Sequence, residues 1–222
     1  MTSVEPTIEL SEFKNTAQLL INFGQTAYAR GWVPATSGNF SARLDEQSIA
    51  VTSSGKHKGK LTLKDILALD LNGEVLGQPF PPGKPSAETA LHTQLYQLFP
   101  KVQAVLHVHS LSAVVLSRTV ASDAVIIENH ELVKAFNGKT THENALAVPI
   151  VDNDQDINRL ASTIGPRLNA SSPAYLIRGH GVYVWGQSME EAERHLEALD
   201  YLFNAEILER QIAPTAFLKT TA

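Results

Sequence analysis

Cysteine is absent from the 222-residue chain, and this absence excludes two kinds of site. A chain without thiols has no disulfide framework and offers no thiolate to a metal ion. Any transition metal must therefore be held by histidine and carboxylate, and the chain contains 8 histidines and 23 acidic residues. Because disulfides mark oxidising compartments, their exclusion favours a cytoplasmic location.

Long apolar runs and clusters of positive charge are also missing. No run approaches the roughly 18 apolar residues of a membrane span, so we expect no membrane partner. The net charge is −5, and no basic cluster exceeds KHKGK at residues 56–60. This balance argues against nucleic acid as a partner. The acidic start MTSVEPTIELSEF lacks the basic and apolar regions of a signal peptide.

Hydrophobic patterning predicts helices and short strands that interleave along the whole chain. Amphipathic helices are expected over residues 8–30 and 190–210, and another from Ser86, after the proline-rich loop 77–85. The uninterrupted pattern predicts one α/β domain over residues 1–222, with a mixed or largely antiparallel sheet. The expected strands are 39–43, 48–53, 66–71, 74–77, 102–109, 124–128, 146–150, 173–177 and 182–186.

The segment AVLHVHS, residues 104–110, places two histidines in an apolar run. Side chains alternate across a strand, so His107 and His109 share one face with Val105. Two imidazoles on a buried face cost free energy to desolvate unless they gain partners. A divalent metal is one such partner, and backbone carbonyls are the alternative.

A third histidine, His180, lies between two glycines in RGHG, in a predicted tight turn between strands. Glycines leave room for the backbone to bend and for a ligand to approach. An exposed turn histidine is the alternative interpretation. Together with His107 and His109, however, it completes the ligand number of a catalytic zinc site with one open position. Neutral imidazole also suits iron, nickel and copper.

Two glutamates are candidate acid or base groups. Glu88, in KPSAET, is expected in the first turn of a helix, where its ordinary role is to complement the helix dipole. Glu131, in IIENHELVKAF, follows a strand directly, where active-site loops often lie, although a plain first-turn glutamate is the alternative. We interpret His130 as a supporting or structural residue. The remaining histidines show no clustering: His57, His92, His142 and His195.

Two glycine-containing stretches are candidate anion sites. ATSGNFS (35–41) and TSSGKHKGK (52–60) combine hydroxyl side chains with exposed backbone N–H groups, and the second adds Lys56. The same composition is common in ordinary turns. The helix expected to begin at Ser86 would supply further N–H donors. The pattern favours a small phosphorylated substrate near a metal.

The motifs TSGN, TSSGK, KPSAE, HVHS and RGHG, in this order, resemble the class II aldolase family across about residues 10–210. The resemblance implies a three-layer α/β/α fold with a central, mainly antiparallel sheet. It also implies a homotetramer with sites near subunit interfaces. One Zn²⁺ per subunit would be held by His107, His109 and His180. The implied phosphate contacts are Gly38, Asn39, Ser54, Gly55 and Ser86, to which the loop chemistry adds Lys56.

The resemblance also implies the type of reaction. KPSAETALHTQLY, VPIVDNDQDI and RGHGVYVWG look like the dehydratases of this family, which act on ketose 1-phosphates. We therefore expect a zinc-dependent lyase, with Glu131 as the acid and Glu88 as a base or ligand near the metal. Since both glutamates are present, the division of roles between them stays open. The alternatives are an aldolase, a pentulose-phosphate 4-epimerase and an inactive binding protein.

Overall fold

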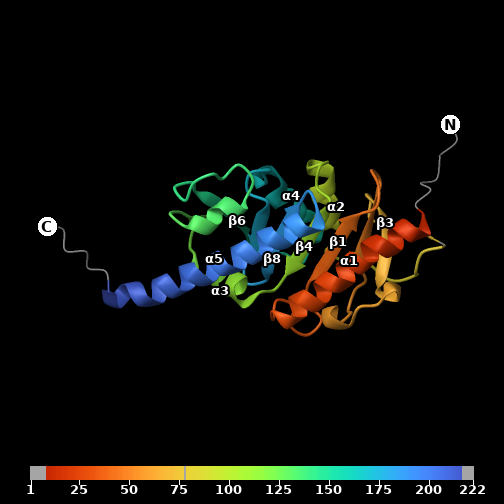
Figure 1. The fold of residues 1–222 in the computed structure, drawn as a ribbon, viewed down its shortest axis with the longest axis horizontal. Helices are drawn as coiled ribbons and strands as arrows, with labels where there is room; N and C mark the ends of the chain where they lie inside the picture. Colours follow the sequence, from red (N-terminus) through yellow and green to blue (C-terminus); the bar gives the residue numbers. More distant parts are fainter. Residues whose placement is uncertain (1–8, 78, 217–222) are drawn as a thin grey trace.

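The computed structural model describes residues 9–77 and 79–216, and its centre is an eight-stranded sheet (Figure 1). The strand order is β3-β2-β1-β4-β8-β7-β6-β5. Neighbouring strands are antiparallel except for β6 and β7, which run parallel. The strands are β1 (Asn39–Arg43), β2 (Ser48–Thr52), β3 (Ile66–Asp70), β4 (Ala104–Val108), β5 (Ala124–Ile127), β6 (Leu146–Val151), β7 (Ala174–Ile177) and β8 (Gly181–Gly186).

Helices cover both faces of this sheet. Figure 1 shows α1 and α5 crossing one face, and α3 packs against α5 and β8 on the same side. On the other face α2 packs against α4. The helices are α1 (Leu10–Ala29), α2 (Thr89–Leu98), α3 (Leu111–Thr119), α4 (Ile157–Ile164) and α5 (Met189–Ala216). The predicted three-layer α/β/α fold with a mainly antiparallel mixed sheet is confirmed.

The two faces of β4 follow the predicted alternation. Ala104, Leu106 and Val108 belong to the apolar core beneath α1 and α5. Val105 belongs to the second core, together with the α2 residue Leu91. The same alternation places His107 on the α2 side of the sheet, fully buried. A central strand thus carries a polar side chain into the interior on the α2 side of the sheet, where Ser41 and His92 are also buried.

Several helix and strand boundaries in the structure differ from the predicted ones. The hairpin arm expected at 74–77 is reduced to a single bridge between Leu69 and Val75. Helix α2 begins at Thr89 rather than at Ser86, because Ser86 first closes a turn by accepting a hydrogen bond from the Thr89 amide at 3.1 Å. Glu88 is consequently the residue that precedes the helix, not a member of its first turn.

Two helices differ from those that the sequence pattern predicts. Helix α4 was not predicted at all; Asp156 caps it by accepting a hydrogen bond from the Arg159 amide. Helix α5 runs from Met189 to Ala216, longer than the predicted 190–210, and its end projects beyond the sheet (Figure 1). Among residues 9–77 and 79–216, none of the helices has the length and apolarity needed to cross a bilayer.

Candidate metal centre and adjoining cavity

The three predicted histidines converge at the end of β4. His107 lies in β4 and His109 just beyond it, while His180 occupies the turn between β7 and β8. Their ligand nitrogens all lie within 4.8 Å of one another. The turn reaches β4 because residue 181 is glycine: a Cβ there would lie 2.2 Å from the Val108 carbonyl oxygen. Backbone contact therefore fixes the third histidine against the first two.

The orientation of His107 leaves one nitrogen available for a metal. Its Nδ1–H donates to the Val182 carbonyl at 3.1 Å, so Nε2 keeps its lone pair. That Nε2 is 2.9 Å from His109 Nε2. Nitrogens on a tetrahedral zinc ion, each about 2.0–2.1 Å from it, lie roughly 3.3 Å apart. The donor set and its spacing fit a divalent metal.

Burial keeps His107 and His109 in the neutral form that binds metals. Desolvation lowers the pKa of His107 well below its usual value, despite the nearby negative charge of Glu88. Desolvation also lowers the pKa of His109 to about 4, and the neighbouring His180 adds to the effect. Neutral imidazoles require no deprotonation before they coordinate a cation.

Glu88 supplies the negative charge of this group. Its Oε1 is 3.1 Å from His180 Nε2, and its Oε2 is 3.7 Å from His107 Nε2. Burial raises the pKa of this carboxyl, but hydrogen bonds from His180 and Asn39 and the neighbouring histidines outweigh burial and hold it below the usual range. Glu88 is therefore an ionised carboxylate facing the metal-binding nitrogens.

A cavity of about 290 Å³ opens beside His109 and Glu88. Gly38 lets one loop approach β4 closely, since a Cβ there would lie 2.7 Å from the His107 carbonyl oxygen. The Ser37 hydroxyl is buried in this wall and has no hydrogen-bond partner among the described residues. Five of the six residues predicted to contact phosphate line the cavity: Gly38, Asn39, Ser54, Gly55 and Ser86.

Two lysines of the same loop have different surroundings. The ammonium of Lys56 is paired with Asp65 at 3.0 Å, and Lys56 is not one of the cavity-lining residues. Lys58, which the sequence analysis did not single out, lines the cavity and is 2% exposed. Its Nζ donates to the carbonyls of Thr36 and Lys56, at 3.0 and 2.8 Å.

The environment of Lys58 makes it a buried positive charge beside the candidate anion site. Desolvation lowers its pKa to about 8, although the charge of Glu88 opposes this shift. Its two carbonyl partners leave one N–H available to a ligand. Nothing in the sequence marks Lys58 above its neighbours, because three lysines lie within residues 56–60 and burial selects among them.

Glu131 lies outside this group in the single chain. It opens the 3-10 turn η3 (Glu131–Ala135), and its exposed carboxylate pairs with Lys134. The neighbouring His130 lies 3.8 Å from Glu206 and 3.7 Å from Glu209, both on α5. The structure thus gathers Glu88 with the three histidines and places Glu131 on a separate surface.

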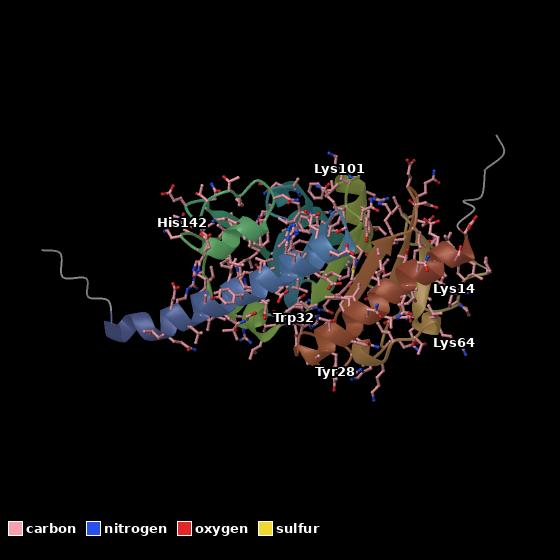
Figure 2. All side chains as sticks on the ribbon, viewed as in Figure 1. Lys14, Tyr28, Trp32, Lys64, Lys101 and His142 are labelled. Atoms are coloured by element: carbon pink, nitrogen blue, oxygen red, sulfur yellow. The ribbon has the colours of Figure 1, made fainter. Side chains whose placement is uncertain are left out.

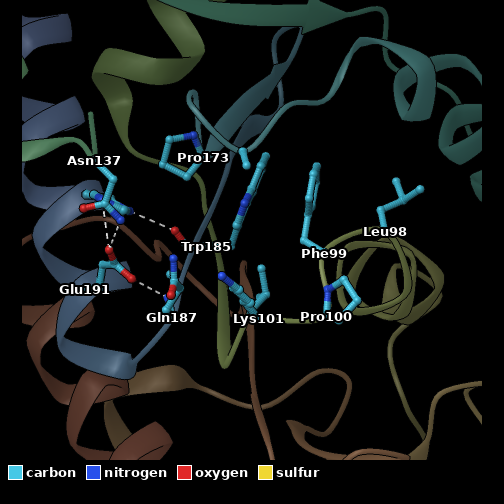
Figure 3. A pocket seen from close by; sticks show the side chains of 13 residues that line it. Leu98, Phe99, Pro100, Lys101, Asn137, Pro173, Trp185, Gln187 and Glu191 are labelled. Carbon is cyan, nitrogen blue, oxygen red and sulfur yellow. Dashed lines mark hydrogen bonds and ion pairs between the residues drawn. The ribbon is translucent and has the colours of Figure 1, made fainter. Parts of the chain in front are cut away.

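A second cavity, of about 270 Å³, lies at the opposite end of β4 and β8 (Figure 3). Its wall includes Phe99 and Trp185, whose rings stack with centroids 5.7 Å apart. His195 also lines it, and the Nδ1–H of His195 donates to the Trp185 carbonyl at 2.9 Å. Of the other histidines, His142 is exposed in the loop before β6 (Figure 2). Neither His142 nor His195 belongs to the group formed by His107, His109 and His180.

Comparison with known proteins agrees with this arrangement. The family model for the class II aldolase and adducin N-terminal domain matches residues 18–207. Methylthioribulose-1-phosphate dehydratase of Pseudomonas aeruginosa (strain LESB58) is 55% identical over 192 residues, covering 86% of this chain and 92% of that protein. The enzyme of the same name from Pseudomonas syringae pv. tomato is 52% identical, covering 88% and 96%.

Solved structures share the fold. YgbL from Escherichia coli is 26% identical and superposes with a TM-score of 0.76, covering 90% of this chain and 91% of that one. L-fuculose-1-phosphate aldolase from Thermus thermophilus is 24% identical, with a TM-score of 0.72 and coverage of 92% and 100%. With its histidine group, ordered motifs and matching family model, the chain belongs to the class II aldolase and adducin N-terminal domain family.

Proposed function

We propose that this protein is a zinc-dependent dehydratase that converts 5-methylthioribulose 1-phosphate to 5-methylthio-2,3-dioxopentyl phosphate and water, in methionine salvage. One observation carries the proposal: three metal-competent histidines converge beside an ionised Glu88, and His109 and Glu88 border the cavity formed by the two glycine-containing loops. Relatives that share more than half of their residues with this chain carry the dehydratase name.

The surrounding residues divide the work of binding and proton transfer. Zinc held by the three histidines would act as a Lewis acid and lower the cost of the negative charge that develops when the C3 proton leaves. Glu88, which faces His180 and His107, is assigned as the base near the metal or as a further ligand. Glu131 is assigned as the acid that protonates the departing C4 hydroxyl.

The phosphate is assigned to the opposite side of the cavity. Backbone N–H groups around Gly38 and Gly55 are assigned as hydrogen-bond donors to the phosphate oxygens. The buried Lys58 supplies a positive charge. The assignment separates the two ends of the substrate: its phosphate meets the loops, and its reacting carbons meet the histidines. Binding energy from the phosphate then orients C3 and C4 for proton transfer.

A homotetramer in the cytoplasm, with sites near subunit interfaces, completes the proposal. Large apolar side chains are exposed on α5, including Tyr201 at 63%, Leu208 at 55% and Ile212 at 56%. Such a surface suits contact with further copies of the chain. Sedimentation of the zinc-loaded protein should give the mass of four chains, and a concentration-independent monomer would contradict the tetramer.

Product analysis tests the reaction. Zinc-loaded protein is incubated with 5-methylthioribulose 1-phosphate, and we expect one diketone phosphate together with water. An aldolase would instead yield two smaller fragments, and a 4-epimerase would return a pentulose phosphate of unchanged mass. Fuculose 1-phosphate serves as the comparison substrate, since the matched Thermus thermophilus structure is an aldolase for it. Fragmentation of either substrate without dehydration would overturn the proposal.

A further inference from the structure

A row of polar residues on α2 faces a row on β1. Glu88, His92 and Tyr96 follow one another at intervals of four along α2 and the residue before it, so they lie on one side of the helix. Asn39 and Ser41 are two apart on β1 and therefore share one face of the sheet. Four helical residues rise about 6.0 Å and two strand residues about 6.6 Å, so the two rows stay in step.

Hydrogen bonds join the two rows alternately. The Asn39 Nδ2–H donates to Glu88 Oε2 at 2.7 Å, and Asn39 Oδ1 lies 2.5 Å from His92 Nε2. Ser41 Oγ lies 2.7 Å from His92 Nδ1 and 2.9 Å from the Tyr96 hydroxyl. His92 and Ser41 are 0% exposed, and Asn39 is 5% exposed. Solvent therefore does not compete for the hydrogen bond between His92 and Ser41.

The orientation of the Asn39 amide sets the direction of the whole chain of hydrogen bonds. Its nitrogen donates to Glu88 and its oxygen, which can only accept, faces His92. His92 must then carry its proton on Nε2 and accept from Ser41 at Nδ1. Ser41 in turn accepts from Tyr96. Burial lowers the pKa of His92 to about 4, against the opposing charge of Glu88, and so supports the neutral ring that this arrangement needs.

We propose that His92 is a positioning residue, which fixes the Asn39 amide so that the Glu88 carboxylate points at His180 and His107. Without the Nε2–H of His92, the amide of Asn39 could rotate and present its oxygen to the carboxylate. Glu88 would lose a donor and its fixed direction. This inference rests on the proposed function to the extent that Glu88 takes part in the dehydration.

Two substitutions separate positioning from packing. The amide nitrogen of glutamine lies where His92 Nε2 lies, whereas the amide of asparagine reaches only the position of Nδ1. We expect His92→Gln to keep kcat within about threefold of the wild type. A misplacement of about 1 Å can cost around 10²-fold, so His92→Asn should lower kcat roughly ten- to a hundredfold with KM unchanged. Zinc content, measured by elemental analysis, should be the same in both variants.

The difference in kcat between His92→Gln and His92→Asn decides between a positioning role and a packing role. If His92 only fills space in the core, both variants lose thermal stability and show equal kcat per bound zinc. That result overturns the proposal. Ser41→Ala is the outer control, because it removes the donor to Nδ1 and leaves the bond between His92 and Asn39. We expect a smaller fall in kcat than for His92→Asn.

A measurement on the wild type remains if a variant does not fold. The ¹⁵N NMR spectrum of histidine-labelled, zinc-loaded protein should show His92 protonated at Nε2 and unprotonated at Nδ1. The opposite tautomer would overturn the positioning role whether or not the enzyme is active. If the spectrum shows the expected tautomer and the wild type does not dehydrate the substrate, the proposed function alone fails.

Discussion

The two ends of the β4–β8 pair hold cavities of nearly equal volume and different chemistry. At the His107 end, about 290 Å³ is bordered by a carboxylate, an imidazole, a buried lysine and two loops rich in N–H groups. At the Trp185 end, about 270 Å³ is walled mainly by apolar side chains, and His195 there donates to a backbone carbonyl. Volume does not distinguish them. The chemistry of the lining does: only the first of these two cavities combines a carboxylate beside three convergent imidazoles with a buried lysine, and such convergence marks functional sites.

The largest expected effect is loss of the metal. In His180→Ala, two imidazoles remain, and a metal ion contributes several kcal/mol to the transition state. Turnover should fall by at least about 10³-fold, since each factor of ten is about 1.36 kcal/mol. Elemental analysis should show that zinc is lost with activity. Chelation of the wild type should reproduce the loss, and added zinc should reverse it. Full zinc occupancy in His180→Ala would contradict the assignment of His180 as a metal ligand.

Glu131→Gln tests whether Glu131 is the general acid, although it lies away from the cavity within a single chain. If Glu131 protonates the C4 hydroxyl, dehydration should fall by roughly 10²–10⁴-fold, while zinc binding and deuterium exchange at C3 persist. Glu88→Gln, the paired variant, should impair C3 exchange, zinc binding or both. Dehydration and exchange are measured on the same samples by mass spectrometry and NMR. Near-normal dehydration by Glu131→Gln would return the acid role to Glu88.

Lys58→Met and Lys56→Met form a matched pair in one loop. A hydrogen bond to a charged group contributes about 1.5–3 kcal/mol, so losing Lys58 should raise KM for the phosphorylated substrate about ten- to a hundredfold. Lys56, paired with Asp65, should be replaceable with little change in KM. Steady-state kinetics at fixed ionic strength measure both. Equal KM values for the two variants would remove Lys58 from the phosphate site.

The smallest expected effect on turnover comes from the other cavity. Trp185→Ala removes a buried ring that stacks on Phe99, and such a truncation typically costs about 3–5 kcal/mol of stability. Turnover per bound zinc should stay within about twofold, because this ring lies at the far end of β8 from His180. Thermal unfolding and zinc-normalised activity are compared. A large loss of turnover in folded protein would show that the two ends are coupled.

The sequence predicted the elements whose pattern is local. Strand alternation placed His107 and His109 on one face, and their Nε2 atoms lie 2.9 Å apart. Helix α4 escaped prediction because it is only eight residues long and includes Asn158, Ser162 and Thr163, which are weak helix formers. Short, polar helices are stabilised by tertiary packing rather than by propensity.

The parts of the site that escaped prediction depend on pairing between distant elements. His92 stood alone in the sequence, and its partners Asn39 and Ser41 lie 53 and 51 residues away. Lys58 is buried and Lys56 is not, and the burial of Lys58 requires the packing of η1 (Lys58–Lys60) against α1. Composition and spacing therefore indicate the candidate metal ligands, whereas the supporting contacts require the fold.

The pairing of β4 with β8 also has a consequence for how the molecule assembles. His107 meets Val182 across 75 residues of chain, and Asn39 meets Glu88 across 49. Contacts that close such long loops form slowly, because the entropy of closure is lost before the contacts can compensate for it. The three histidines proposed to bind the metal come together only when this central pair has formed. Bound metal should therefore slow unfolding far more than it speeds folding.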